Sequence, residues 1–309
     1  MLGKFRSLFV HQSTSGDYLR VGSSKRNIPP EHLARLFQQR SQARLIRFDE
    51  QTIHGATLDD LEPALWQRFL TKLSDTQRES FLGKMAMARQ DDEGTWRPSV
   101  AGVLLASKDP QQWLANAFIQ AVAYRGEVAR PNSPGEAYQL DAADITGPLD
   151  TQIIDACRFV ARNVRVAATK DIGRTDYPQF HLGAVFEAIA NAVAHRDYSM
   201  ARSKIRLRVF SDRLELYSPG ALANSMDVAS LPYRQAARNE TIVGLLARLP
   251  VPPQADWLRT GRTAIMDRRG EGVSLLLDES EDLSGRRPEF RMIDESELLL
   301  TIWAASAPG

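Results

Sequence analysis

The sequence predicts an α+β fold in which helices cover one face of a mixed or antiparallel sheet. The main observation is the order of elements in the C-terminal half: helix, hairpin, helix, glycine-opened helix and hairpin. The composition, with 43% apolar and 25% charged residues, is that of an ordinary globular protein. A length of 309 residues is enough for two domains, or for one large domain with an appendage.

Residues 1–50 contain too few elements to fold as a domain of their own. Alternating residues predict a strand at 18–21, and a proline pair opens a helix that runs over 29–40. Nine Lys and Arg oppose two acids in residues 1–47, whereas residues 48–67 hold five acids and no base. A basic segment of this kind is either a solvated face or the remnant of a nucleic-acid-binding surface.

Residues 51–150 mix helices with a strand, and we assign them to an α/β connector. Helices are expected at 61–73, 75–88 and 99–107, a strand within 116–126 and a loop at 130–138. Residues 151–309 are assigned to one further domain. Its expected elements are helices at 150–167 and 187–198, a hairpin of strands 204–210 and 213–218, helices at 237–249 and 268–280, and strands at 289–294 and 297–305.

The helix at 187–198 carries a line of polar residues. Glu187, Asn191 and His195 are four residues apart, so they lie in one stripe along the helix. Alanines flank that stripe, and the large apolar residues fall on the opposite side. A solvated helix face is the ordinary interpretation of such a stripe. The alanine flanks, taken together with the glycines downstream, favour instead the wall of a ligand site.

This stripe and the glycines downstream of it fit a nucleotide site that has no P-loop. The amide oxygen of Asn191 is a ligand that Mg²⁺ accepts together with phosphate oxygens and water. The carboxylate of Glu187, one turn earlier, is placed to polarise a water toward a terminal phosphate. Farther along the chain, Gly270 and Gly272 open a helix whose backbone N–H groups favour phosphate.

Together and in this order, these segments resemble the GHKL (Bergerat-type) ATPase fold of gyrase and histidine kinases. The resemblance is strongest to bacterial RecG-like proteins proposed to be transcriptional regulators, in which the ATPase-like module follows a Schlafen AlbA-like domain. The matching segments are EAIANAVAHRDYS, FSDRLELYSPGAL, ARNETIVGLL and DRRGEGVSLLLDES. Upstream, YLRVGSSKRNIPPEHLARLFQQR is similar to the closing strand and helix of the AlbA-like domain.

The resemblance implies a role for each matching residue of the helix. Asn191 would be the Mg²⁺ ligand between protein and phosphates, and Glu187 would be the catalytic residue that orients or activates the hydrolytic water. His195 and Arg196 complete the helix signature and would lie near the phosphates or the helix end. A lid drawn from residues 221–269 would cover the bound nucleotide.

The same resemblance places two glycine turns around the nucleotide. The first turn, with Ser218 and Gly220, would meet the adenine, and the second, with Gly270 and Gly272, would lie beside the phosphates. This family branch usually carries Asn at the position of Ser218, which offers adenine only one short hydroxyl. The chain also starts partway into the AlbA-like domain and stops before the family's winged-helix segment, so a member truncated at both ends is expected.

The sequence therefore predicts an ATP-binding, Mg²⁺-dependent module with slow or conditional hydrolysis, part of a transcriptional regulator whose ATP state is read by DNA or by a protein partner. The alternative is a nucleic-acid-binding regulator or interaction protein with a vestigial, non-hydrolysing nucleotide site. Ser218 favours that alternative, and the retained Glu187 and Asn191 oppose it. If the chain is an enzyme, it is an ATP hydrolase and not a helicase, because it contains no G-x-x-x-x-G-K-[ST] motif.

The remaining sequence features concern location and assembly. The chain contains no apolar run long enough to span a bilayer and no opening signal peptide, and its single cysteine, Cys157, has no partner for a disulfide. These features predict a cytoplasmic protein without a membrane partner. The oligomeric state stays open, a homo-oligomer included.

Overall fold

The computed structural model describes residues 18–21, 24–27, 47–75, 77–130, 138–164, 166–169, 175–222, 226–233, 236–258, 260–267, 270–294 and 296–306. The chain forms two compact units, residues 1–47 and 48–309. In the first unit, β1 (Tyr18–Val21) pairs antiparallel with β2 (Ser24–Asn27), which confirms the strand expected at 18–21. The helix expected at 29–40 and most of the loop expected at 130–138 lie outside the described residues.

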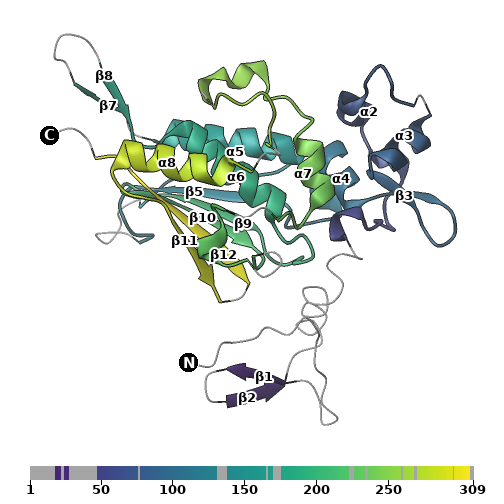
Figure 1. The fold of residues 1–309 in the computed structure, drawn as a ribbon, viewed down its shortest axis with the longest axis horizontal. Coiled ribbons are helices and arrows are strands. Elements are labelled where there is room, and N and C mark those ends of the chain that lie inside the picture. Colours follow the sequence, from purple (N-terminus) through teal and green to yellow (C-terminus); the bar gives the residue numbers. More distant parts are fainter. Residues whose placement is uncertain are drawn as a thin grey trace. The chain divides into compact units, whose positions relative to one another are not determined.

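The second unit is built on a six-stranded sheet (Figure 1). Its strands, in spatial order, are β11 (Glu289–Ile293), β12 (Glu297–Trp303), β10 (Arg213–Pro219), β9 (Ile205–Val209), β5 (Ile119–Tyr124) and β6 (Gln139–Ile145). The sheet is mixed because β5 and β9 run parallel, whereas the other neighbouring pairs are antiparallel. Two of its strands come from the segment assigned to a connector, so the connector and the C-terminal half share one sheet.

Three helices lie over one face of this sheet: α5 (Leu149–Asn163), α6 (Leu182–His195) and α8 (Gly272–Ser284) (Figure 1). The central helix α6 packs against both α5 and α8 and against β10. The shorter α7 (Glu240–Leu246) packs against α6 and against α4 (Val100–Ala106). The predicted α+β class, with helices over one face of a mixed sheet, is confirmed.

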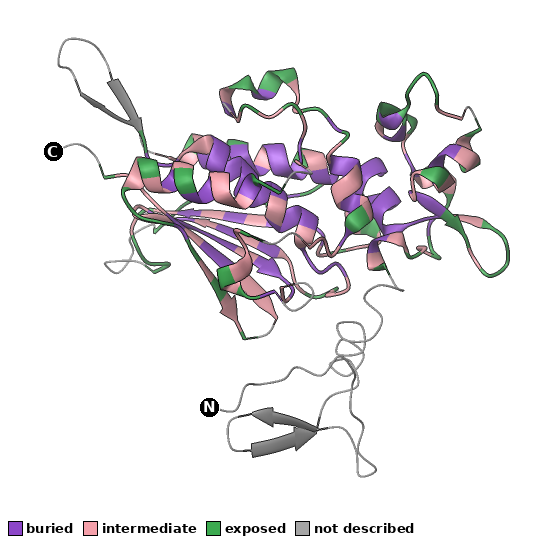
Figure 2. Ribbon diagram, viewed as in Figure 1, coloured by how far each residue is buried: buried purple, intermediate pink, exposed green. Residues whose placement is uncertain are grey.

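The hydrophobic core fills the space between these helices and the sheet, where Figure 2 shows buried residues on both layers. In β9 the buried residues alternate with half-buried arginines, because successive side chains of a strand point to opposite faces. In α6, Phe186 and Ile189 are fully buried. Burial of each such large apolar side chain stabilises the fold by about 1.5–3 kcal/mol. These residues therefore determine the side of α6 that faces the core.

The remaining elements lie at the ends of the unit and in its loops. The helix expected at 61–73 is shorter than predicted: α2 (Pro63–Trp66) passes into a 3-10 turn, η3 (Gln67–Phe69), and ends there. Side chains compete with the helix at this point, since the Ser74 hydroxyl accepts a hydrogen bond from the Thr71 N–H at 2.8 Å. The other elements are η1 (Phe48–Glu50), η2 (Leu58–Asp60), α3 (Arg78–Lys84), β3 (Ala88–Gln90), β4 (Trp96–Pro98), η4 (Pro110–Gln112), β7 (Val166–Thr169), β8 (Thr175–Pro178), η5 (Val228–Ser230) and η6 (Pro253–Leu258).

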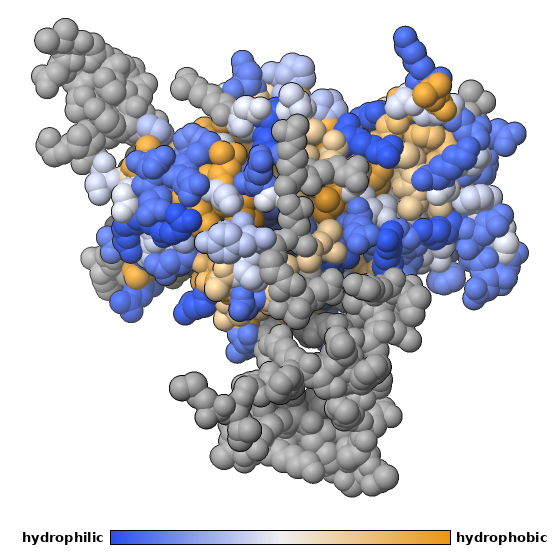
Figure 3. Space-filling view, viewed as in Figure 1, coloured by the Kyte–Doolittle hydropathy of each residue, from blue (hydrophilic) through white to orange (hydrophobic). Residues whose placement is uncertain are grey.

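The visible surface is mainly hydrophilic, with apolar side chains gathered in smaller patches (Figure 3). Within the described part of the chain, none of the helices combines the length and the apolar character needed to cross a membrane. Cys157 is free and fully buried in α5, and burial raises the pKa of its thiol.

Candidate functional site

A pocket of about 270 Å³ lies between α6, strands β10, β11 and β12, the start of α8 and residues of the segment that joins β10 to α8. Seven of the eight site residues predicted from the sequence line it: Glu187, Asn191, His195, Ser218, Gly220, Gly270 and Gly272. They come from three separate parts of the chain. The alanines of α6 that flank the polar stripe, Ala188 and Ala192, also face the pocket.

Arg196, the eighth predicted residue, is not among the residues that line the pocket. It is 2% exposed, donates to the Ser203 carbonyl at 2.5 Å and stacks over the ring of Tyr198 at 4.9 Å. Its neighbour in space, Asn239, donates to the carbonyls of Ala194 (2.9 Å) and Arg196 (2.8 Å). Asn239 therefore satisfies carbonyl groups at the C-terminal end of α6, which an α-helix leaves without intrahelical partners.

One end of the pocket is apolar. Leu216, Leu298, Leu300 and Phe290 line it from neighbouring strands, and Met226 also lines the pocket. Ser218, at 9% exposure, is a polar group among them, and its hydroxyl donates to the carbonyl of Ala192 at 3.1 Å. Because the hydroxyl hydrogen is used in this bond, the oxygen presents lone pairs as acceptors. This end suits a flat apolar ring that carries a hydrogen-bond donor on its edge.

The other end of the pocket is polar, and Asn191 stands at its centre. The Asn191 amide nitrogen donates to the Glu187 carbonyl one turn earlier at 2.8 Å and lies 3.5 Å from the Glu187 carboxylate. The amide oxygen accepts no hydrogen bond from the described residues, so it is the free ligand atom of the stripe.

A magnesium ion would fit this end as an ion held jointly by the protein and a bound ligand. The described residues contain no group of three or more His, Cys, Asp or Glu that could hold a metal by themselves. Mg²⁺ keeps several waters and needs only one or two protein oxygens when phosphates complete its shell. The Asn191 oxygen supplies one such donor.

The close approach of Gly272 to Glu187 brings the start of α8 to the polar end. A Cβ built at position 272 would lie 2.2 Å from the Glu187 Oε2, a distance that real side chains do not adopt. A side chain at this position would therefore force either the Glu187 carboxylate or the start of α8 to shift. The same approach places the first backbone N–H groups of α8, which have no helical acceptor, at this end of the pocket.

Gly220 shapes the opposite wall, where β10 leaves the sheet. Its φ is +122°, and a Cβ would lie 2.8 Å from the Asp197 Cβ, so no other residue fits this turn well. The Asp197 carboxylate pairs with Arg238 at 3.0 Å, and Arg238 also donates to the Ala221 carbonyl at 2.5 Å. This pair holds the residues after Gly220 against the end of α6.

His195 is a neutral residue of the pocket wall near pH 7. Burial, together with the positive charge of Arg238, lowers the pKa of His195 to about 4. An imidazole with this pKa offers one donor and one acceptor and carries no charge toward a phosphate.

Arg262 does not itself line the pocket, but it contacts a residue that does, and the sequence reasoning missed it. Its guanidinium pairs with the Glu187 Oε1 at 2.7 Å and also with Asp267, which itself lines the pocket. Burial raises the pKa of the Glu187 carboxyl, and the charge of Arg262 opposes that shift. Arg262 lies in the irregular segment between η6 and α8, where no periodic pattern points to its partner.

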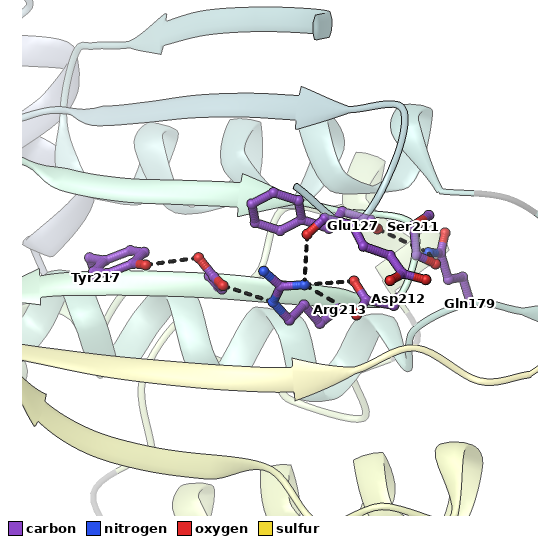
Figure 4. A network of polar contacts seen from close by, with 8 residues as sticks. Glu127, Gln179, Ser211, Asp212, Arg213 and Tyr217 are labelled. Carbon is purple, nitrogen blue, oxygen red and sulfur yellow. Dashed lines mark hydrogen bonds and ion pairs between the residues drawn. The ribbon is translucent and has the colours of Figure 1, made fainter. Parts of the chain in front are cut away.

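A second polar cluster lies away from the pocket, at the hairpin of β9 and β10 (Figure 4). Arg213 pairs with Asp212 and with Glu215, both at 2.8 Å, and Glu215 accepts a hydrogen bond from the Tyr217 hydroxyl at 2.8 Å. Arg213 also donates to the Glu127 carbonyl at 3.1 Å. The cluster ties the hairpin to the loop after β5.

Comparison with known proteins supports an ATPase-like module. A family model described as "Putative ATP-dependent DNA helicase recG C-terminal" matches residues 202–302, which include both glycine turns. Curated proteins gave no match. A crystal structure of the DIP2311 protein from Corynebacterium diphtheriae is similar to 94% of this chain, with a TM-score of 0.57 and 20% sequence identity. The chain spans about half of that protein's length, 53%, and the likeness concerns the fold alone.

Proposed function

We propose that the second unit is a GHKL-type module that binds ATP with Mg²⁺ in this pocket and hydrolyses it slowly. The observation that carries the proposal is the convergence of Glu187, Asn191, Ser218 and the two glycine turns on one pocket with an apolar and a polar end. Part of this pocket belongs to the residues that match an ATPase-like family.

The apolar end would hold the adenine. Leu216, Leu300 and Phe290 offer apolar contact to the faces of the ring. The Ser218 oxygen, whose own hydrogen is given to Ala192, accepts from the exocyclic amine. A single hydroxyl acceptor selects for adenine less strongly than a carboxylate would at this position, because charge-assisted hydrogen bonds are stronger.

The polar end would hold the phosphates. The first N–H groups of α8, beside Gly270 and Gly272, donate to phosphate oxygens. The Asn191 oxygen holds Mg²⁺, which neutralises phosphate charge and orients the phosphate chain. Glu187 orients a water toward the terminal phosphate once its carboxylate is free to accept a hydrogen bond from that water.

Nucleotide binding without turnover is the second candidate, and one observation favours it. The Glu187 Oε1 is engaged by Arg262 at 2.7 Å, so this carboxylate is tied up in an ion pair. In that case the chain would respond to ATP as a ligand, and the bound state would be the signal.

The wider setting follows from the resemblance to RecG-like regulators. In this proposal residues 1–50 belong to an AlbA-like domain, residues 51–150 connect it to the nucleotide-binding part at 151–309 and add two strands to the same sheet, and DNA or a protein partner reads the ATP state in the cytoplasm. A homo-oligomer is compatible with the same proposal.

Calorimetric titration of the full chain with ATP tests the proposal. We expect binding in Mg²⁺ that weakens at least tenfold in EDTA and in Asn191→Ala. Asn163→Ala is the matched control, because the Asn163 amide also donates to the carbonyl four residues earlier, at 2.9 Å, but on α5 outside the pocket. The proposal fails if wild type binds no nucleotide at millimolar concentration. It also fails if Asn191→Ala and Asn163→Ala weaken ATP binding equally.

A further inference from the structure

Arg262 occupies a position that neither the resemblance nor the family match assigns. Its side chain is 13% exposed and lies between two carboxylates, those of Glu187 and Asp267. Its Nε atom is buried without a hydrogen-bond partner in the described part of the chain. A buried donor without an acceptor is costly and needs an explanation.

Two hydrogen bonds hold the backbone that follows Arg262. The Val251 N–H donates to the Thr263 carbonyl at 3.1 Å, and the Ile265 N–H donates to the Leu249 carbonyl at 2.9 Å. These bonds fix the backbone that follows Arg262, so a change of partner there would fall to its long side chain.

The partner that competes best with a carboxylate for a guanidinium is a phosphate. A planar guanidinium pairs with carboxylate or phosphate through two parallel N–H groups, and a terminal phosphate brings more charge than one carboxylate. Glu187 lines the polar end of the pocket, so the Arg262 guanidinium that contacts it is adjacent to the site proposed for the last phosphate.

We propose that Arg262 is a specificity residue for nucleoside triphosphates, which exchanges its contact with Glu187 for the terminal phosphate. This inference rests on the proposed function. The exchange has two consequences. Arg262 favours a triphosphate over a diphosphate, and its departure frees Glu187 to hold the water only when a terminal phosphate is present.

The test is a calorimetric titration of wild type and Arg262→Gln with ATP and with ADP, both in Mg²⁺. Because a charged hydrogen bond to the terminal phosphate is lost, ATP affinity should fall roughly ten- to a hundredfold, while ADP affinity should change less than about threefold. Arg248→Gln is the control, since it removes the same charge at an exposed site of the same lid segment. It should leave both affinities unchanged.

A double-mutant cycle separates the exchange from simple charge repulsion. Glu187→Gln should raise ATP affinity in the Arg262 background, because Arg262 no longer has to leave a carboxylate. The rise should disappear in Arg262→Gln. A rise of equal size in both backgrounds means that Glu187 merely repels phosphate, and it overturns the inference.

The remaining outcomes are also decisive. If wild type binds neither ATP nor ADP, the proposed function fails and this inference falls with it. If wild type binds ATP and ADP, and Arg262→Gln lowers the two affinities equally or lowers neither of them, only the inference about Arg262 is overturned. Should Arg262→Gln not fold, Arg262→Lys keeps the charge but not the paired N–H groups, and it should lose ATP affinity selectively by a smaller factor.

Discussion

The contact between Gly272 and Glu187 makes a sharp prediction about stability. In Gly272→Ala the new Cβ would lie 2.2 Å from the Glu187 Oε2, where an ordinary contact begins at 3.4 Å. Either the start of α8 shifts or the carboxylate leaves Arg262. Overpacking a dense region costs about 1–3 kcal/mol, and weakening a buried ion pair adds to this. We expect a loss of about 2–4 kcal/mol, or roughly 5–10 °C in Tm.

Chemical and thermal denaturation followed by circular dichroism measure this loss. Gly244→Ala is the matched control, because Gly244 lies inside α7 and its Cβ would meet nothing within 4 Å. That exchange should stabilise the protein by about 0.5–1 kcal/mol, since alanine is the better helix former. In a Glu187→Ala background the cost of Gly272→Ala should fall below about 1 kcal/mol. A neutral or stabilising Gly272→Ala in the wild-type background would refute the described approach of α8 to Glu187.

Three further predictions concern buried groups. The pKa of His195 is about 4 in the folded protein and near 6.5 in the unfolded chain, so between these pH values the unfolded chain binds more protons. The free energy of unfolding should therefore fall by up to about 1.4 kcal/mol per pH unit as the pH drops from 6.5 to 4. Urea titrations across that range should show a shallower slope for His195→Gln, and an unchanged slope would contradict this pKa. Asn239→Ala should cost about 2 kcal/mol in the same assay, because it leaves the carbonyls of Ala194 and Arg196 without their donor. Cys157 should react with a thiol reagent only after unfolding, because its thiol is buried and the pKa of that thiol is raised. Rapid labelling of the native protein would argue against the place of Cys157 in the core.

Much of the sheet and the placement of the polar stripe could be predicted from local pattern. Apolar and polar residues alternate in β9, in β11 and in most of β10, and the four-residue spacing of Glu187, Asn191 and His195 needs only helical geometry. The structure brings these three residues to one pocket with Ser218.

Other elements could not be predicted because their signals are weak or distant. β6 is an edge strand whose burial pattern is mostly exposed, and its sequence QLDAADI holds acids where a half-buried strand would alternate. Its partner β5 joins β9, so residues assigned to a connector became part of the main sheet. Arg262 was missed for a different reason: an irregular segment carries no period, and only the tertiary fold shows that its guanidinium reaches Glu187.

The central claim is that one pocket holds the adenine at Ser218 and the phosphates at Asn191 and Gly272. A crystal structure of the full chain with Mg²⁺ and a non-hydrolysable ATP analogue tests it most directly. We expect the base against Leu216 and Phe290, a metal at the Asn191 oxygen, and phosphates at the start of α8. An analogue bound outside the pocket, or one bound with its phosphates at Ser218, would contradict it.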